Sequence, residues 1–158
     1  MDIDMITEFI ENLDGVLTLA PGPDSGYPEV SWGDRFFYYA PDGQVPTRTQ
    51  PFATVVTKDY PDDTTSNLDR RGVVRLNINA GREAFTATLG YGPRDIDDHP
   101  VDASEFDTWI PHPVYGTAAW LSVVNPATAT QATARDLLRA AHRRARTADE
   151  RRADQRSS

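Results

Sequence analysis

The stretch from Glu29 to Tyr60 constrains the fold of this chain more than any other part of it. Residues 31–39 are rich in aromatic side chains, and residues 40–43 (APDG) follow with the residue types of a tight turn. A second β-prone run, residues 52–57, comes after the turn. The stretch therefore predicts a β-hairpin, the building unit of an antiparallel sheet.

Local patterns predict helices at both ends of the chain. Apolar residues repeat at helical spacing over residues 3–13, and Thr128 with Gln131 forms a capping pattern for a final helix. A third helix is expected over residues 81–89, and a single helical turn over residues 64–69.

Further strands are expected on both sides of the hairpin. Residues 73–79 (VVRLNIN) alternate between apolar and polar side chains, which places Arg75, Asn77 and Asn79 on one face of a strand. Shorter strands are expected over residues 16–19 and 119–124. Residues 90–105 are irregular and predict a long surface loop.

Short connections between strands favour an antiparallel sheet with helices on one side. We predict a single α+β domain, a two-layer sandwich whose antiparallel sheet of about five strands carries the N- and C-terminal helices on one face. A chain of 158 residues, 39% of them apolar, suits one hydrophobic core. The domain is expected over residues 1–146, with residues 147–158 as a polar, disordered tail because apolar periodicity ends there.

Charge is unevenly distributed along the chain, and this distribution indicates which kinds of partner the protein can bind. Residues 1–134 carry 8 basic against 20 acidic side chains, whereas residues 135–158 carry 8 arginines against 4 acids. A body this acidic repels phosphate backbones and anionic lipid, so we expect no binding to nucleic acid or to membranes.

Two absences narrow the function classes further. The chain has no cysteine, which excludes disulfides, thiolate zinc sites and a cysteine nucleophile. Its first residues lack a secretory signal pattern, and no segment approaches the ~20 apolar residues of a membrane span. We therefore expect a cytoplasmic protein.

Three segments carry a resemblance to a known family: SWGDRFFYYAPDG, QPFATVVTKDYPDDTTSNLDRRGVVRLNINAGREAF and HPVYGTAAWLSVVNP. They resemble a family of bacterial proteins of similar length that is described only as a domain of unknown function, and the similarity covers nearly the whole chain. This resemblance implies no activity, substrate or catalytic residue.

The second half of the chain resembles, at the level of pattern, the MmcQ/YjbR-like proteins. The shared features are a strand that ends in an asparagine, a following helix, a tryptophan-containing strand and a terminal helix. The resemblance implies a small α+β domain with an antiparallel sheet. It also suggests DNA binding, which the acidity of residues 1–134 disfavours.

Aromatic side chains on the predicted strands and their connections indicate a binding groove. The candidate ligand-binding residues are Trp32, Tyr38, Asn77, Trp109, Tyr115 and Trp120. We expect them to hold a small molecule or a protein partner, without a cofactor or a metal, in a non-enzymatic binding module that is a monomer or a weak homodimer.

A second hypothesis is a small hydrolase or lyase. His112 would be its general acid or base, since a histidine near aromatic residues can titrate near neutrality, and Asp34 or Lys58 would assist. Lys58 next to buried aromatic residues could itself act as a base, or it could simply pair with Asp34 or Asp59.

Two weaker patterns complete the candidates. The aromatic residues 36–39 and the basic last helix could bind nucleic acid by stacking, although the acidic charge disfavours it. The loop from Asp95 to His99 is either a solvated acidic loop or a site for a hard cation. His142 lies among arginines on the last helix and is expected at the surface.

Overall fold

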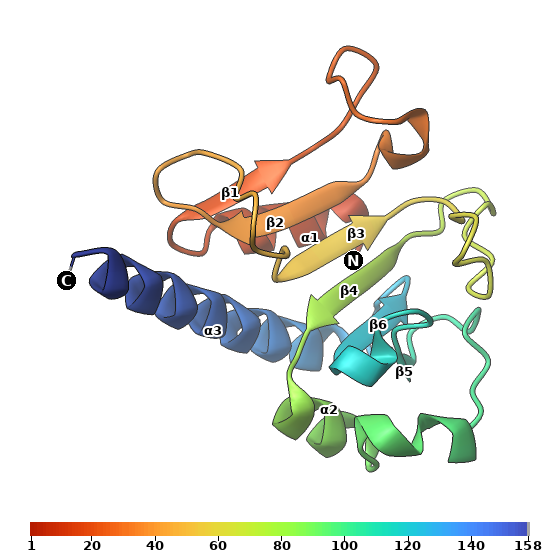
Figure 1. Cartoon of the computed structure of the whole chain (residues 1–158). Coiled ribbons are helices and arrows are strands. Elements are labelled where there is room, and N and C mark those ends of the chain that lie inside the picture. Colours follow the sequence, from red (N-terminus) through yellow and green to blue (C-terminus); the bar gives the residue numbers. More distant parts are fainter. Residues whose placement is uncertain (158) are drawn as a thin grey trace.

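Six strands form one antiparallel sheet in the computed structural model of the chain, which describes residues 1–157 (Figure 1). They are β1 (Val16–Leu19), β2 (Arg35–Tyr39), β3 (Ala53–Val56), β4 (Arg75–Asn79), β5 (Trp109–Pro111) and β6 (Trp120–Val124). Their order across the sheet is β1-β2-β3-β4-β6-β5, and each neighbouring pair is antiparallel. The predicted α+β fold is confirmed.

The sheet has more strands than the sequence suggests because β5 has no recognisable pattern. This strand has only three residues, and one of them is Pro111. Proline cannot donate a hydrogen bond to a neighbouring strand, so it is tolerated where β5 lies, at the edge of the sheet.

The helices lie close to where periodicity predicts them. They are α1 (Ile3–Glu11), α2 (Arg82–Leu89) and α3 (Gln131–Ser157), with short 3₁₀ helices η1 (Glu29–Ser31), η2 (Pro93–Asp98) and η3 (Gly116–Ala118). The Asp2 side chain caps α1 by accepting a hydrogen bond from the backbone N–H of Met5 at 2.9 Å. Residues 64–69 form turns instead of the expected helical turn, and η2 lies within the expected surface loop.

Helix α3 continues through residues 147–157, where the sequence suggests a tail; Ser158 of that tail lies outside the described residues. Apolar burial does not explain this continuation, because the segment is mostly polar. Ion pairs along the helix, Arg146 with Glu150 and Arg152 with Asp149, support it instead.

The hydrophobic core lies between the helices and one face of the sheet. It combines Ile6 and Ile10 of α1, alternate residues of the central strands, and the apolar stripe of α3; its largest fully buried side chains include Phe37, Val55, Leu76, Ile78, Leu121 and Leu138. The expected packing of both terminal helices on one face therefore agrees with the structure.

His142 was expected at the surface but is only 6% exposed. Its ring lies edge-on to Tyr39 and Phe52, and its Nε2 is 2.6 Å from the backbone carbonyl oxygen of Asp14. The arginines on both sides of it in the sequence conceal that it shares the inward face of α3 with Leu138.

We predict that Leu138→Asp unfolds the domain. Truncation of a buried leucine alone costs about 2–5 kcal/mol, and a desolvated carboxylate adds to that cost. The total stability of a domain is only about 5–15 kcal/mol. Circular dichroism should show no cooperative melting for this variant. Thr147→Asp changes an exposed position of the same helix and should melt like the wild type. A normal transition for Leu138→Asp would contradict the described packing.

Candidate binding site

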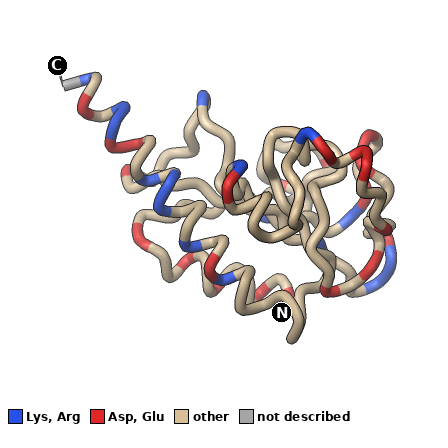
Figure 2. Tube along the Cα trace, turned by 90° about the horizontal axis from the view of Figure 1, so that it is seen from below, with Lys and Arg blue, Asp and Glu red and all other residues tan. Residues whose placement is uncertain are grey.

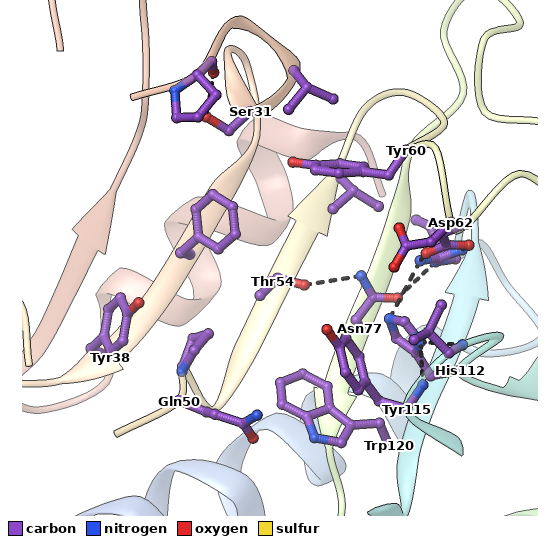
Figure 3. Close-up of a pocket in the computed structure, with 18 residues that line it drawn as sticks. Ser31, Tyr38, Gln50, Thr54, Tyr60, Asp62, Asn77, His112, Tyr115 and Trp120 are labelled. Carbon is purple, nitrogen blue, oxygen red and sulfur yellow. Dashed lines mark hydrogen bonds and ion pairs between the residues drawn. The ribbon is translucent and has the colours of Figure 1, made fainter. Parts of the chain in front are cut away.

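A cavity of about 450 Å³ opens on the sheet face that the helices leave free (Figure 3). Side chains alternate along each strand, so Phe37 and Val55 point toward the helices while Phe36 and Thr54 point the other way, into the cavity. The volume falls within the ~300–1,000 Å³ that is usual for small-molecule sites.

A row of buried polar side chains crosses the sheet beneath this cavity. Thr54 pairs in register with Asn77, and Asn77 with Ser122. The Nδ2 of Asn77 donates a hydrogen bond to the Thr54 hydroxyl at 2.9 Å, and the Ser122 hydroxyl donates to the Oδ1 of Asn77 at 2.6 Å. The three side chains therefore hold one another in fixed orientations.

Arg75 is the charged centre of this row, and its side chain is only 1% exposed. Its Nε donates to the Oδ1 of Asn77 at 2.8 Å. Its two terminal nitrogens bind the carboxylate of Asp63 at 3.0 and 2.5 Å, and one of them also donates to the Ser66 hydroxyl. Burial alone would raise the pKa of Asp63, but the hydrogen bonds and charge of Arg75 lower it below its usual value.

His112 lies beside Arg75 and is also buried. Its Nδ1 accepts hydrogen bonds from the backbone N–H groups of Val114 and Tyr115, both at 3.0 Å. Burial of the ring and the nearby charge of Arg75 lower the pKa of His112 to about 3, although the charge of Asp63 acts in the opposite direction. The imidazole is therefore neutral near pH 7, and its Nδ1 lone pair is already used. We call Thr54, Asn77, Arg75 and His112 the cavity floor.

A fully buried carboxylate, that of Asp34, anchors one wall of the cavity. Asp34 accepts hydrogen bonds at 2.8 Å from both the backbone N–H and the hydroxyl of Thr57, and it pairs with Lys58 at 3.2 Å. The hydroxyl of Tyr60 also donates to Asp34. Burial and this hydrogen bond raise the pKa of Tyr60, so its phenol stays protonated.

Tyr60 connects the carboxylates of Asp34 and Asp63. Its side chain reaches Asp34, while its backbone exchanges hydrogen bonds with that of Asp63, at 2.9 and 3.2 Å. The Asp34 group and the Arg75 group are therefore held by one short segment of chain.

Aromatic rings surround the floor. The rings come from Phe36 and Tyr38 of β2, from Tyr60, from Tyr115, and from Trp120 of β6. Figure 3 shows Tyr38, Tyr60, Tyr115 and Trp120 around Thr54, Asn77 and His112. The ring centroids of His112 and Tyr115 are 5.0 Å apart, and those of His112 and Trp120 are 6.2 Å apart. The site thus combines apolar walls with a polar floor.

The structure brings together some of the candidate residues and separates others. The candidates that line the cavity are Tyr38, Asn77, His112, Tyr115 and Trp120. Trp32 and Trp109 lie outside it: the indole N–H of Trp32 donates to the carbonyl of Tyr27 at 3.1 Å, and Trp109 packs against the core on the helix side.

Asp34 and Lys58 also lie outside the lining, behind Tyr60. Lys58 pairs with Asp34 and donates to the backbone carbonyl of Trp32 at 2.5 Å. This is the pairing that the sequence analysis gave as the alternative to Lys58 acting as a catalytic base.

Sequence reasoning missed several residues of the site. The alternation over residues 73–79 places Arg75 on the same face as Asn77, but nothing local signals that this arginine is buried. Its partner Asp63 and the wall residue Tyr60 were not among the candidates, and Phe36 was considered only for nucleic-acid stacking.

In the structure, the loop from Asp95 to His99 packs against Tyr91 through its last residue. His99 stacks on Tyr91, with ring centroids 4.1 Å apart and an angle of 4° between the planes. Within residues 1–157, no group of three or more histidine and acidic side chains is arranged to hold a metal ion. No helix in the same range is long and apolar enough to span a membrane.

Basic residues lie along α3, and acidic residues alternate with them on the same helix (Figure 2). Arg139 pairs with Asp136 of the same helix at 3.2 Å, and Arg146 lies 3.6 Å from Asp14 near the end of α1. Of the aromatic run of β2, Phe36 and Tyr38 face the cavity while Phe37 is buried in the core. The run therefore does not present one continuous stacking surface.

Comparison with known protein families assigns the chain to one of them. The profile of DUF6194, a family of unknown function, matches residues 1–154, and the chain belongs to this family. The predicted near full-length membership of such a family is confirmed, whereas the resemblance to MmcQ/YjbR-like proteins is not. No curated protein and no solved structure shows a significant match to the chain.

We predict that Asp63→Asn destabilises the protein by about 3 kcal/mol, because it leaves the buried Arg75 cation without its counter-charge. Asp62→Asn is the matched control, since this neighbouring carboxylate is exposed and has no described ion pair in residues 1–157. Urea unfolding of the two variants and the wild type measures the difference. Equal stabilities for the two variants would show that the Arg75–Asp63 pair does not hold the site together.

Proposed function

We propose that this DUF6194 protein binds a small organic molecule in the cavity on the free face of its sheet. The observation that carries the proposal is the buried Arg75 network beneath aromatic walls. A buried ion pair is a costly way to stabilise a sheet, and apolar residues of similar size would often serve stability equally well. A charged floor in a cavity is better explained by recognition of polar groups on a ligand.

The walls favour a flat, largely apolar ligand. Phe36, Tyr38, Tyr60, Tyr115 and Trp120 offer ring faces and edges, and aromatic pairs gain stability in both arrangements. The concave shape favours a small molecule over a protein partner. A cytoplasmic location and a monomeric or weakly dimeric state remain predictions from the sequence.

The geometry gives less support to the hydrolase or lyase hypothesis. A general base needs a free lone pair, and His112 uses the one on Nδ1 to accept two backbone hydrogen bonds. The described hydrogen bonds of the Asp34 carboxylate are with Thr57, Lys58 and Tyr60, so it does not assist His112 through a hydrogen bond. We therefore propose binding without catalysis.

We predict that Tyr115→Ala weakens binding of any cavity ligand about fivefold, by removing one aromatic wall. Tyr115 is 50% exposed, so its loss should leave the fold intact. Hits from a metabolite library, found by thermal shift and by tryptophan fluorescence, would be titrated against both chains.

Tyr27→Ala is the control for this prediction, because Tyr27 is 42% exposed and lies outside the cavity lining. It should bind each hit like the wild type. The proposal fails if no compound binds, or if every hit binds Tyr115→Ala as tightly as the wild-type chain.

A further inference from the structure

Two hydrogen-bond donors face each other in the cavity floor. The Nη2 of Arg75 lies 3.4 Å from the Nε2 of His112, and both side chains line the cavity. An arginine nitrogen can only donate. Whether this contact is a hydrogen bond therefore depends on which ring nitrogen of His112 carries the proton.

The backbone decides the position of that proton. Two N–H groups, of Val114 and Tyr115, point at Nδ1, so Nδ1 must be the unprotonated acceptor. A neutral imidazole then carries its proton on Nε2. His112 and Arg75 both donate at this point, and the gap between them needs an acceptor from elsewhere.

The nearby protein acceptors are already engaged. The two carboxylate oxygens of Asp63 bind Arg75, and the Oδ1 of Asn77 accepts from both Arg75 and Ser122. Among the hydrogen bonds of residues 1–157, none gives the Nε2–H of His112 an acceptor. His112 is only 7% exposed, and a buried donor without a partner is costly.

Thr54 adds a third donor to the floor. Its hydroxyl oxygen accepts from Asn77, which leaves its own proton free to point into the cavity. The floor therefore presents donors to an occupant, and a complementary ligand presents acceptors.

The charges of the lining favour a neutral acceptor over an anionic one. Arg75 is neutralised by Asp63, and Asp62 adds a further negative charge to the lining. Residues 1–134 are also strongly acidic, with 20 acidic against 8 basic side chains. A carboxylate or phosphate would be repelled, whereas a carbonyl oxygen would not.

We propose that the cavity binds a neutral, planar aromatic molecule whose carbonyl oxygen accepts a hydrogen bond from the Nε2–H of His112 beside Arg75. Aromatic lactams are the ligand class that fits this description. The inference rests on the proposed function, because it names the ligand of the same cavity. The ring system lies among the aromatic walls, and its carbonyl edge meets the floor.

Three bicyclic probes of matched size test the inference: quinolinone, which is a neutral lactam; naphthalene, which has no acceptor; and naphthoate, which is anionic. Each is titrated into the full chain, followed by tryptophan fluorescence and by amide shifts in NMR spectra. We expect quinolinone to bind about tenfold more tightly than naphthalene, and naphthoate to bind more weakly than quinolinone.

The variant His112→Asn locates the hydrogen bond. Its Oδ1 lies near the position of Nδ1 and can still accept from the backbone of Val114 and Tyr115, but it has no donor at the position of Nε2. The advantage of quinolinone over naphthalene should disappear in this variant.

The outcomes separate this inference from the proposed function. If naphthalene binds as tightly as quinolinone, or naphthoate binds most tightly, the inferred ligand class is wrong but cavity binding stands. If quinolinone keeps its advantage in His112→Asn, the assigned donor is wrong. If no probe binds, the inference fails, and the library screen then decides the proposed function. The comparison of probes on the wild-type chain decides the ligand class even if the variant does not fold.

Discussion

The burial of one guanidinium group, that of Arg75, organises this domain around its cavity. A desolvated cation is tolerated only when it is paired with a counter-charge and supported by hydrogen bonds. Arg75 meets that requirement through Asn77 on its own strand and through Asp63 and Ser66 in the connection before it. Ser122 on β6 joins this network by donating a hydrogen bond to Asn77. Two strands and a long connection are thereby held to one point on the free face of the sheet.

The same network explains why His112 has a fixed role. Burial of the ring and the charge of Arg75 keep the imidazole neutral, and the backbone N–H groups of the next residues donate to its Nδ1 lone pair. The sequence suggests that His112 transfers protons. In the structure, His112 is instead a hydrogen-bond donor at Nε2 with a fixed direction. The chemistry of the floor is therefore recognition by hydrogen bonding.

Local patterns were sufficient for most of the fold and for part of the site. The hairpin, the alternation over residues 73–79 and the terminal helices follow from periodicity and turn chemistry, which depend on neighbours in the chain. Strand β5 and the extension of α3 were missed because neither has an apolar period. Tyr38 and Trp120, chosen as aromatic residues on strands, line the cavity, whereas Trp109 does not; nothing local showed which face of β5 it occupies.

The partners of the buried charges were harder to predict, because they are distant in the sequence and local patterns do not reach them. Arg75 and Asp63 are separated by 12 residues, and Tyr60 and Asp34 by 26. Such pairs form only when the fold brings them together, and nothing in the sequence around either residue signals its partner. A sequence with eight basic residues among its first 134 gives no sign of which one is buried.

The protonation of the His112 ring tests the central claim most directly. Two-bond ¹H–¹⁵N correlation spectra of the imidazole, with His112 assigned by its absence in His112→Asn, report which nitrogen carries the proton. The account predicts a protonated Nε2 and an unprotonated Nδ1, unchanged between about pH 5 and pH 7, where an ordinary histidine titrates. A protonated Nδ1, or titration near the ordinary value, would contradict the donor floor and the ligand class inferred from it.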